Sequence, residues 1–170
     1  GYYDHNMLVM SERISDHLPK TQKYLPKQRL WYIRANEVLI SSGSIERPLV
    51  FGNNDTPGVM LSSAAKEYMK VYGVLVGKKP LIFTNNDSGY ETAIEFKKNG
   101  VNPIILDTRS NPSSDIITEA KNLNIEIKFS HVVVAAKGYK KVKSADIAKI
   151  SDDKKELFNI ENIECDCICV

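Results

Sequence analysis

Two short apolar runs flank a helical segment between residues 79 and 109, and this alternation leaves few folds open to the chain. Residues 80–83 are apolar, residues 84–89 form a polar turn, and residues 90–98 have helical character with Gly100 as a stop signal. A second apolar run at 104–106 ends on Asp107. Two strands joined by a helix pair in parallel through a right-handed crossover. The stretch therefore predicts an α/β domain with a parallel sheet.

The polar turn lies where dinucleotide-binding domains carry three glycines in the pattern G-x-G-x-x-G. The first glycine forms the tight turn, the second lets the backbone approach the pyrophosphate, and the third packs helix on strand. In this chain the three positions hold Thr84, Asn86 and Gly89, so only the packing glycine remains. The sequence predicts the framework of a cofactor fold with an altered phosphate-binding turn.

Residues around the start of the predicted helix favour an empty turn. Ser88 and Glu91 fit the S-x-x-E capping box, which would satisfy the N–H groups that otherwise hold a phosphate. Asp87 adds a negative charge at the positive end of the helix dipole, and the side chain of Asn86 fills space that a phosphate would need. Asn86 and Asp87 remain candidate cofactor contacts, but the pattern counts against a working pyrophosphate site.

Asp107 is the third candidate of this region. It lies about 20 residues beyond the turn, where an acid holds the ribose 2′-hydroxyl in dinucleotide-binding domains. Arg109 could instead meet a 2′-phosphate. An aspartate that ends a strand and opens a turn is also common without any ligand. The sequence leaves these alternatives open.

A second candidate site follows the apolar run at 37–40, which we expect to be a strand. The run breaks at Ser42-Gly43, and backbone amides at the carboxyl edge of an α/β sheet are where ligands bind. Ser44 continues the turn and Arg47 supplies a cation beside it. We predict cofactor contacts at Ser42, Gly43, Ser44 and Arg47, with a plain turn that ends at Pro48 as the alternative.

Two stretches of the chain share one architecture. In the first, strands at 7–14 and 29–34 flank a hairpin at 19–26, and the strand at 37–40 follows. In the second, strands at 131–134 and 141–150 flank the turn at 137–139, and a polar loop at 151–156 leads to a strand at 163–170. The second stretch stops at its last strand, so we expect this chain to be a piece of a longer polypeptide.

The segment between the two stretches completes the α/β pattern. Ser62 or Ser63 is expected to cap a helix that runs to Tyr72 and stops at Gly73. A helix at 114–122 and a strand at 125–129 follow the strand–helix–strand unit. The predicted fold is a Rossmann-like parallel sheet domain with a β-meander (77–170). It is preceded by the meander and last strand of a first nucleotide-binding domain plus a connecting helix (1–76).

Composition excludes several classes of function. A net charge of +2 argues against a nucleic-acid partner, and no apolar run is long enough to span a bilayer. No signal peptide is visible, so a cytoplasmic location is expected. The histidines show neither metal spacing nor a triad pattern, and we predict no catalytic residue and no metal.

Cysteines and lysines each form one cluster. Cys165, Cys167 and Cys169 alternate along one face of the expected last strand, as small buried hydrophobic residues in a reducing compartment. Four lysines straddle the turn at 137–139, and we interpret them as a solvated charged edge. A nucleic-acid patch is the alternative, and it would also require exposed aromatic side chains. The four are Lys137, Lys140, Lys141 and Lys143.

Four segments resemble a known family. They are 1–6 (GYYDHN), 30–51 (LWYIRANEVLISSGSIERPLVF), 53–60 (NNDTPGVM) and 83–88 (FTNNDS). The chain resembles the alpha subunit of heterotetrameric sarcosine oxidase, within the wider pyridine-nucleotide–disulfide oxidoreductase-like group. The likeness is weakest from Ser110 to Asn162.

The resemblance implies a role in the oxidative demethylation of sarcosine to glycine, with hydrogen peroxide and methylenetetrahydrofolate as products. It implies a bound NAD in the alpha subunit, FAD and FMN in a partner subunit, and beta, gamma and delta subunits as partners. In the wider group an Ala-Thr-Gly motif at a strand end lines the dinucleotide of the first domain. Here that motif is Ser41-Ser42-Gly43. The glycine-rich loop that grips the pyrophosphate is absent from these residues.

Three hypotheses follow. The first is a fragment of a sarcosine oxidase alpha subunit that supplies a nucleotide-domain scaffold and part of an NAD site, and is not catalytic alone. The second is an NAD(P)H-dependent flavoprotein reductase domain, which the loss of glycine at Thr84 and Asn86 counts against. The third is a ligand-free module that only builds a subunit interface.

Overall fold

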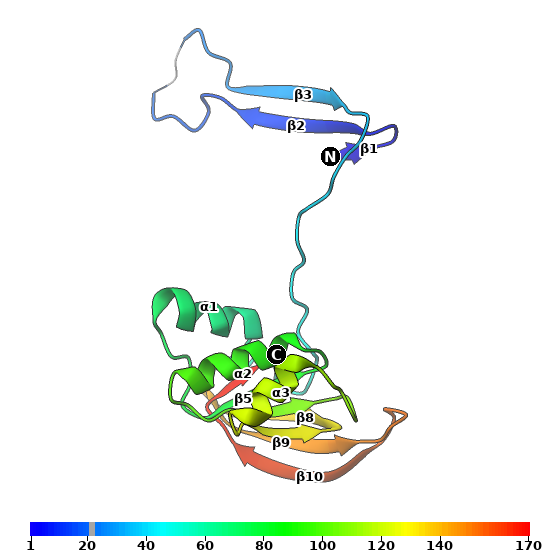
Figure 1. Cartoon of the computed structure of the whole chain (residues 1–170). Helices are drawn as coiled ribbons and strands as arrows, with labels where there is room; N and C mark the ends of the chain where they lie inside the picture. The colour runs from blue at the N-terminus through cyan, green and yellow to red at the C-terminus, as the bar shows by residue number, and fades with distance from the viewer. Residues whose placement is uncertain (21–22) are drawn as a thin grey trace. The chain divides into compact units, whose positions relative to one another are not determined.

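The computed structural model describes residues 1–20 and 23–170, which form two compact units, 1–44 and 45–170 (Figure 1). The first unit is a three-stranded antiparallel sheet in the order β1-β2-β3. Its strands are β1 (Tyr2–Tyr3), β2 (Met7–Arg13) and β3 (Gln28–Arg34). The pairing of β2 with β3 confirms the two long predicted strands. The predicted hairpin at 19–26 includes residues 21–22, which lie outside the described residues.

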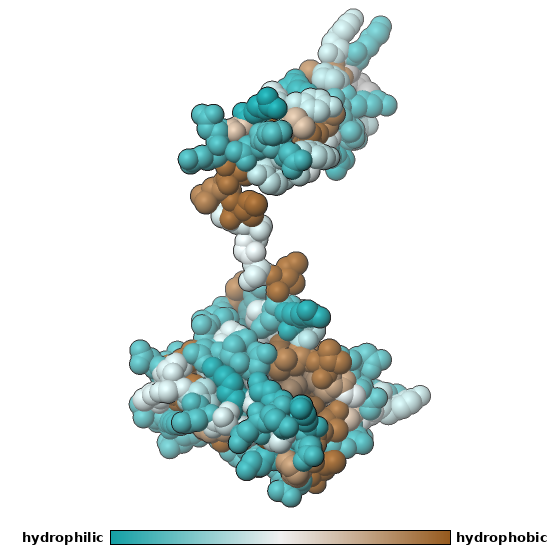
Figure 2. Space-filling model, turned by 90° about the vertical axis from the view of Figure 1, so that its right-hand side faces the viewer, coloured by the Kyte–Doolittle hydropathy of each residue, from teal (hydrophilic) through white to brown (hydrophobic). Residues whose placement is uncertain are grey.

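The strand predicted at 37–40 is wrong for this structure. Residues 35–50 carry no strand, and Leu39 and Ile40 are 92% and 72% exposed. Apolar side chains along this connecting stretch are open to solvent in Figure 2. A strand exists only when its N–H and C=O groups pair with a neighbour, and the described residues offer none here.

A parallel sheet forms the centre of the second unit, as predicted, with the strand order β4-β11-β5-β6-β7. The strands are β4 (Val59–Met60), β5 (Pro80–Thr84), β6 (Ile104–Asp107), β7 (Glu126–Phe129) and β11 (Cys167–Cys169). The helices are α1 (Ser62–Tyr72), α2 (Ser88–Lys98) and α3 (Asp115–Asn122). Within the described ranges, no helix combines the length and the apolar character needed to cross a membrane.

The predicted β-meander is confirmed as an antiparallel sheet in the order β10-β9-β8. Its strands are β8 (His131–Gly138), β9 (Val142–Ile150) and β10 (Leu157–Glu164). One core cluster, with Tyr90 and Phe96, joins the helices to the parallel sheet. A second, with Leu106 and Ile147, joins that sheet to the meander. The unit therefore has three layers: helices, parallel sheet and meander (Figure 1).

The single strand predicted at 163–170 is wrong, because the chain changes sheets in the middle of it. Strand β10 ends at Glu164 in the meander, and β11 joins the parallel sheet beside β5. The carboxylate of Asp166, at the crossing, accepts hydrogen bonds from the backbone N–H groups of Lys78 (2.9 Å) and Lys79 (2.8 Å). This long-range contact holds the chain where it leaves one sheet for the other, whereas the local sequence pattern predicts one continuous strand.

The cysteines are buried, as predicted, but they do not share one face. Cys165 belongs to the cluster on the meander side, whereas Cys167 and Cys169 belong to the cluster on the helix side, with their Sγ atoms 3.6 Å apart. Burial raises the pKa of the Cys165 thiol to about 12. A thiol in such surroundings stays protonated and packs as a small hydrophobic group.

The compact units divide between Ser44 and Ile45, whereas the predicted domains divide between residues 76 and 77. Strand β4 pairs with β11, and the N–H of Ser62 donates to the carbonyl of Val170 at 2.9 Å. These bonds attach residues 59–62 to the second unit. The assignment of residues 1–76 to a first nucleotide-binding domain stays a prediction about a longer protein.

Candidate functional site

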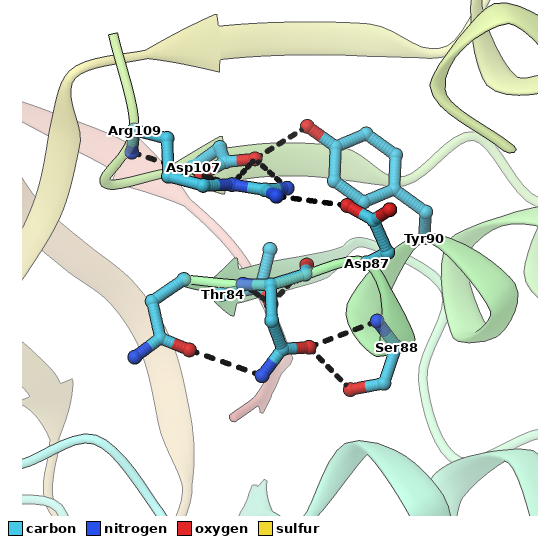
Figure 3. Close-up of polar contacts among 8 residues, drawn as sticks. Thr84, Asp87, Ser88, Tyr90, Asp107 and Arg109 are labelled. Carbon is cyan, nitrogen blue, oxygen red and sulfur yellow. Dashed lines mark hydrogen bonds and ion pairs between the residues drawn. The ribbon is translucent and has the colours of Figure 1, made fainter. Parts of the chain in front are cut away.

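Two of the predicted candidate segments meet at the carboxyl edge of the parallel sheet. Strands β5 and β6 pair in register so that Thr84 lies opposite Asp107, and the N–H of Thr108 donates to the carbonyl of Thr84 at 3.0 Å. This pairing brings the β5–α2 turn and the residues after β6 together (Figure 3). Open α/β sheets bind ligands at this edge.

Arg109 joins the two segments through a pair of carboxylates. Its Nε lies 3.0 Å from Oδ1 of Asp107 and its Nη2 lies 2.8 Å from Oδ2, while its Nη1 forms an ion pair with Asp87 at 2.8 Å. The Tyr90 hydroxyl donates to Asp107 Oδ2 at 2.7 Å. Figure 3 shows Arg109 between the two acids, with the Tyr90 ring reaching in from α2. Asp107 is fully buried, so a ribose hydroxyl would reach it only by displacing these donors.

Electrostatic shifts agree with this network. Hydrogen bonding to Asp107 raises the pKa of Arg109, and the Arg109 guanidinium holds the pKa of Asp87 below its usual range. Burial, and then the hydrogen bond to Asp107, raises the pKa of Tyr90. The tyrosine is therefore a neutral donor and the arginine a permanent cation. The group is an ion-pair cluster in which the contact between Arg109 and Asp87 is an ion pair without hydrogen-bond geometry.

The β5–α2 turn is held by Asn86, not by the predicted capping box. Asn86 Oδ1 accepts hydrogen bonds from the N–H (2.9 Å) and the hydroxyl (2.7 Å) of Ser88. The Thr84 hydroxyl donates to the carbonyl of Asn86 at 2.9 Å and accepts from its N–H at 3.2 Å. Glu91 instead pairs with Lys66 of α1 at 2.6 Å, so the capping-box prediction is wrong. The turn still satisfies itself, as predicted, through different partners.

Gly89 keeps the packing role that the glycine fingerprint gives it. A Cβ atom at this position would lie 2.7 Å from Cβ and 2.8 Å from Oγ1 of Thr84. Real Cβ atoms do not approach other atoms so closely, so only glycine lets α2 start against the end of β5. The third fingerprint position is thus preserved in structure as well as in sequence.

The other predicted contacts belong to the segment around the boundary between the two units. Ser42, Gly43 and Ser44 are exposed residues of the first unit, and Arg47 is an exposed residue of the second. Gly43 has φ +69°, and a Cβ added to it would meet nothing within 4 Å. Beside Arg47 in the sequence, the carboxylate of Glu46 accepts a hydrogen bond from the N–H of Ser63, near the start of α1, at 2.9 Å. Of the predicted contacts, the structure brings Asn86, Asp87 and Asp107 together within the second unit.

The sequence prediction missed a cavity of about 320 Å³ beside Arg109. The ends of β6 and β7 and the loop between β9 and β10 form its walls. The loop was predicted only as polar, and its closeness to the strand ends is a property of the three-layer fold. The lining residues are Thr108, Arg109, Ser110, Asn111, Pro112, Ser130, Ser151, Asp152 and Lys154.

The sequence pattern predicts Tyr90 only as the first residue of a helix and gives it no role at the site. A tyrosine on the first turn of the helix, with an acid ending the next strand, is the signal that could have found it. In the described parts of the chain, no three His, Cys, Asp or Glu side chains group in a way that could hold a metal ion.

Comparison with known proteins gives sequence relatives over most of the chain. No family model matches it. A protein of Rhizobium meliloti (strain 1021) named sarcosine oxidase subunit alpha is 38% identical over 148 residues, which are 86% of this chain and 14% of the relative. The subunit of the same name from Corynebacterium sp. (strain P-1) is 32% identical over 173 residues, which are 100% of this chain and 18% of the relative. The chain thus spans less than a fifth of these relatives.

Solved structures share the fold at low sequence identity. Thioredoxin reductase of Lactococcus lactis superposes with a TM-score of 0.64 at 14% identity, over 83% of this chain and 45% of that one. Thioredoxin reductase of T. acidophilum gives a TM-score of 0.61 at 18% identity, over 84% of this chain and 46% of that one. At such identities the likeness establishes the Rossmann-type fold and nothing further.

Proposed function

The chain belongs to the sarcosine oxidase alpha subunit family. We propose that it supplies such a subunit with a nucleotide-domain scaffold of the kind found in the pyridine nucleotide–disulfide oxidoreductase-like group. In this proposal the β5–α2 turn is structural. The chain contributes part of an NAD site through Ser42, Gly43, Ser44 and Arg47, and no catalytic residue.

The observation that carries the proposal is that side chains of the chain itself already occupy the β5–α2 turn. The N–H of Ser88, the first of α2, already donates a hydrogen bond to the side chain of Asn86. The carboxylate of Asp87 forms an ion pair with the guanidinium of Arg109 at 2.8 Å. A pyrophosphate at this turn would have to displace Asn86 and would meet the negative charge of Asp87 at the helix N-terminus. An anionic cofactor gains little at such a turn, which supports a scaffold role.

Residues 42–47 offer the features that the turn lacks. Gly43 combines a positive φ with open space around its Cα, and its neighbours Ser42 and Ser44 are exposed. Backbone amides of such a segment are free to approach a phosphate or ribose once the rest of a first domain surrounds them. Arg47 forms no ion pair among the described residues and would add a cation.

The activity of a whole subunit is part of the same proposal. It comprises oxidative demethylation of sarcosine, NAD bound in the alpha subunit, FAD and FMN in a partner subunit, and assembly with beta, gamma and delta subunits. A cytoplasmic location belongs to it as well, and cell fractionation tests that. The names of the relatives, which describe an oxidase subunit, support this part.

A second candidate function is favoured by the cavity beside Arg109. An NAD(P)H-dependent flavoprotein reductase would bind its nicotinamide cofactor in the second unit, and a polar cavity of about 320 Å³ lies at the edge where such a ligand would bind. The filled turn next to it counts against this alternative. A ligand-free interaction module is the third candidate.

Titration of NAD separates the three. The full-length protein that contains this chain and the chain 1–170 alone would each be titrated by calorimetry. Binding only to the full-length protein is the expected result. Binding to the chain alone would favour the reductase, and binding to neither would favour the interaction module.

A further inference from the structure

The hairpin between β8 and β9 carries a concentrated positive charge. Of its four lysines, Lys137 pairs with Asp146 at 2.9 Å. Lys140, Lys141 and Lys143 are exposed and form no ion pair within the part of the chain that the structure describes. Three uncompensated cations therefore lie within four residues of one turn.

An aromatic side chain accompanies these cations. Tyr139 is 92% exposed at the tip of the hairpin. Together with Lys140, Lys141 and Lys143 it surrounds a hollow of about 470 Å³. A tyrosine loses little conformational entropy when it is buried by a partner, and tyrosine is enriched among the residues that dominate binding energy.

The base of the hairpin is fixed while the tip is free. Val142 is fully buried, and its N–H donates to the carbonyl of Pro57 at 2.9 Å. The carbonyl of Lys143 accepts from the N–H of Cys165 at 3.2 Å. Gly138 has φ +149°, and a Cβ there would lie 1.9 Å from the carbonyl oxygen of Lys141. These contacts hold the base of the hairpin against the rest of the second unit.

We propose that the tip of the β8–β9 hairpin, residues 139–141, docks together with the adjoining Lys143 on an acidic face of a partner protein. The proposal does not depend on the NAD site. Charge complementarity identifies the partner, because three unpaired lysines around one tyrosine match a cluster of carboxylates. A single-stranded nucleic acid fits less well, since the tip has one aromatic side chain for stacking and the chain has a net charge of only +2.

The test uses the full chain and two fluorescent probes, a poly-L-glutamate peptide and an oligothymidylate of similar charge. The variant is K140E/K141E, and the matched control is K154E/K155E, which reverses two exposed lysines in the β9–β10 loop. Fluorescence anisotropy at low and moderate salt gives Kd and its salt dependence. Circular dichroism confirms that both variants remain folded.

We expect the chain to bind poly-L-glutamate more tightly than oligothymidylate. K140E/K141E should weaken peptide binding about tenfold or more and flatten its salt dependence, whereas K154E/K155E should change Kd by less than about twofold. Tyr139→Ala should weaken binding by about threefold at unchanged net charge. Equal losses in the two double variants, no loss in either, or hairpin-dependent binding that prefers oligothymidylate would overturn the proposal.

Discussion

Asp107 is a fully buried acid, and Arg109 and Tyr90 provide all the hydrogen bonds that its carboxylate accepts among the described residues. Removal of one partner of a buried ion pair leaves an uncompensated charge, which costs more than the pair itself contributes. The side chain of Arg109 is 29% exposed, so water can replace part of what is lost. These three residues therefore govern the stability of the carboxyl edge.

Replacement of Arg109 by Met should lower the free energy of unfolding by about 2–4 kcal/mol, because Asp107 stays buried without its cation. Urea unfolding at neutral pH measures the loss. The matched control is Arg47→Met, which removes an exposed arginine without an ion pair in the described chain and should cost less than about 0.5 kcal/mol. Equal losses in both variants would show that Arg109 does not hold the edge together.

Asp87 gives the edge a dependence on pH with a defined sign. The Arg109 guanidinium lowers the pKa of Asp87 in the folded chain, so the contribution of Asp87 is present above its unfolded pKa. It is lost as the pH falls through the lower folded pKa. Because the Asp87 side chain is 45% exposed, the contribution is small, about 1 kcal/mol or less.

The variant Asp87→Asn should thus be less stable than the parent at neutral pH, and the difference should vanish in acid below the ordinary range of an aspartate pKa. Urea unfolding of both proteins over a pH series checks this. Asp152→Asn, which removes an exposed acid outside any described ion pair, serves as control and should show no such convergence. A gap that grows as the pH falls would contradict the assigned sign.

At the scale of elements, the start of α2 depends on close contact with β5. Gly89→Ala should cost about 1–3 kcal/mol, because the new Cβ lies 2.7 Å from Cβ of Thr84 and neither backbone can easily retreat. Gly100→Asn is the matched control. Gly100 has a positive φ (+78°), but a Cβ added to it would meet no atom within 4 Å. Asparagine tolerates that conformation, so this control should cost less than about 1 kcal/mol. Thermal unfolding that ranks them in the opposite order would contradict the packing role.

Elements that depend on local pattern could be predicted from the sequence, and those that depend on distant partners could not. The strand–helix–strand unit follows from apolar periodicity and the Gly100 stop. The capping box failed because Glu91 has a stronger partner in Lys66, 25 residues away in the chain. The predicted strand at 163–170 failed because Asp166 holds the chain to Lys78 and Lys79, where it changes sheets. The cavity beside Arg109 arises only when the meander folds over the sheet.

At the scale of the whole chain, the two units differ in how much apolar surface they bury. Among the described residues, every buried apolar side chain lies between Phe51 and Val170. All seven residues of β3 are exposed. A sheet without a core is held mainly by its ladder of backbone hydrogen bonds, which is marginal in water. The second unit therefore carries the stability of this chain.

Hydrogen exchange of the full chain should show this difference directly. Amides of β5 and β6 should exchange only through global opening, whereas those of β2 and β3 should exchange faster by about two orders of magnitude or more. Mass spectrometry of exchanged peptides measures both in one sample. Similar protection in the two units would contradict the prediction that residues 1–44 lack independent stability.

We propose that residues 42–47, and not the β5–α2 turn, contribute to an NAD site. NAD titration into two variants of the full-length protein distinguishes the two segments. Gly43→Val places a side chain on the segment proposed to approach the cofactor. Ser88→Glu adds a negative charge at the first residue of α2, where the helix dipole tolerates it and a pyrophosphate would not. We expect Gly43→Val to weaken NAD binding about tenfold or more and Ser88→Glu to leave it unchanged. Loss of binding in Ser88→Glu with normal binding in Gly43→Val would instead assign the cofactor to the β5–α2 turn.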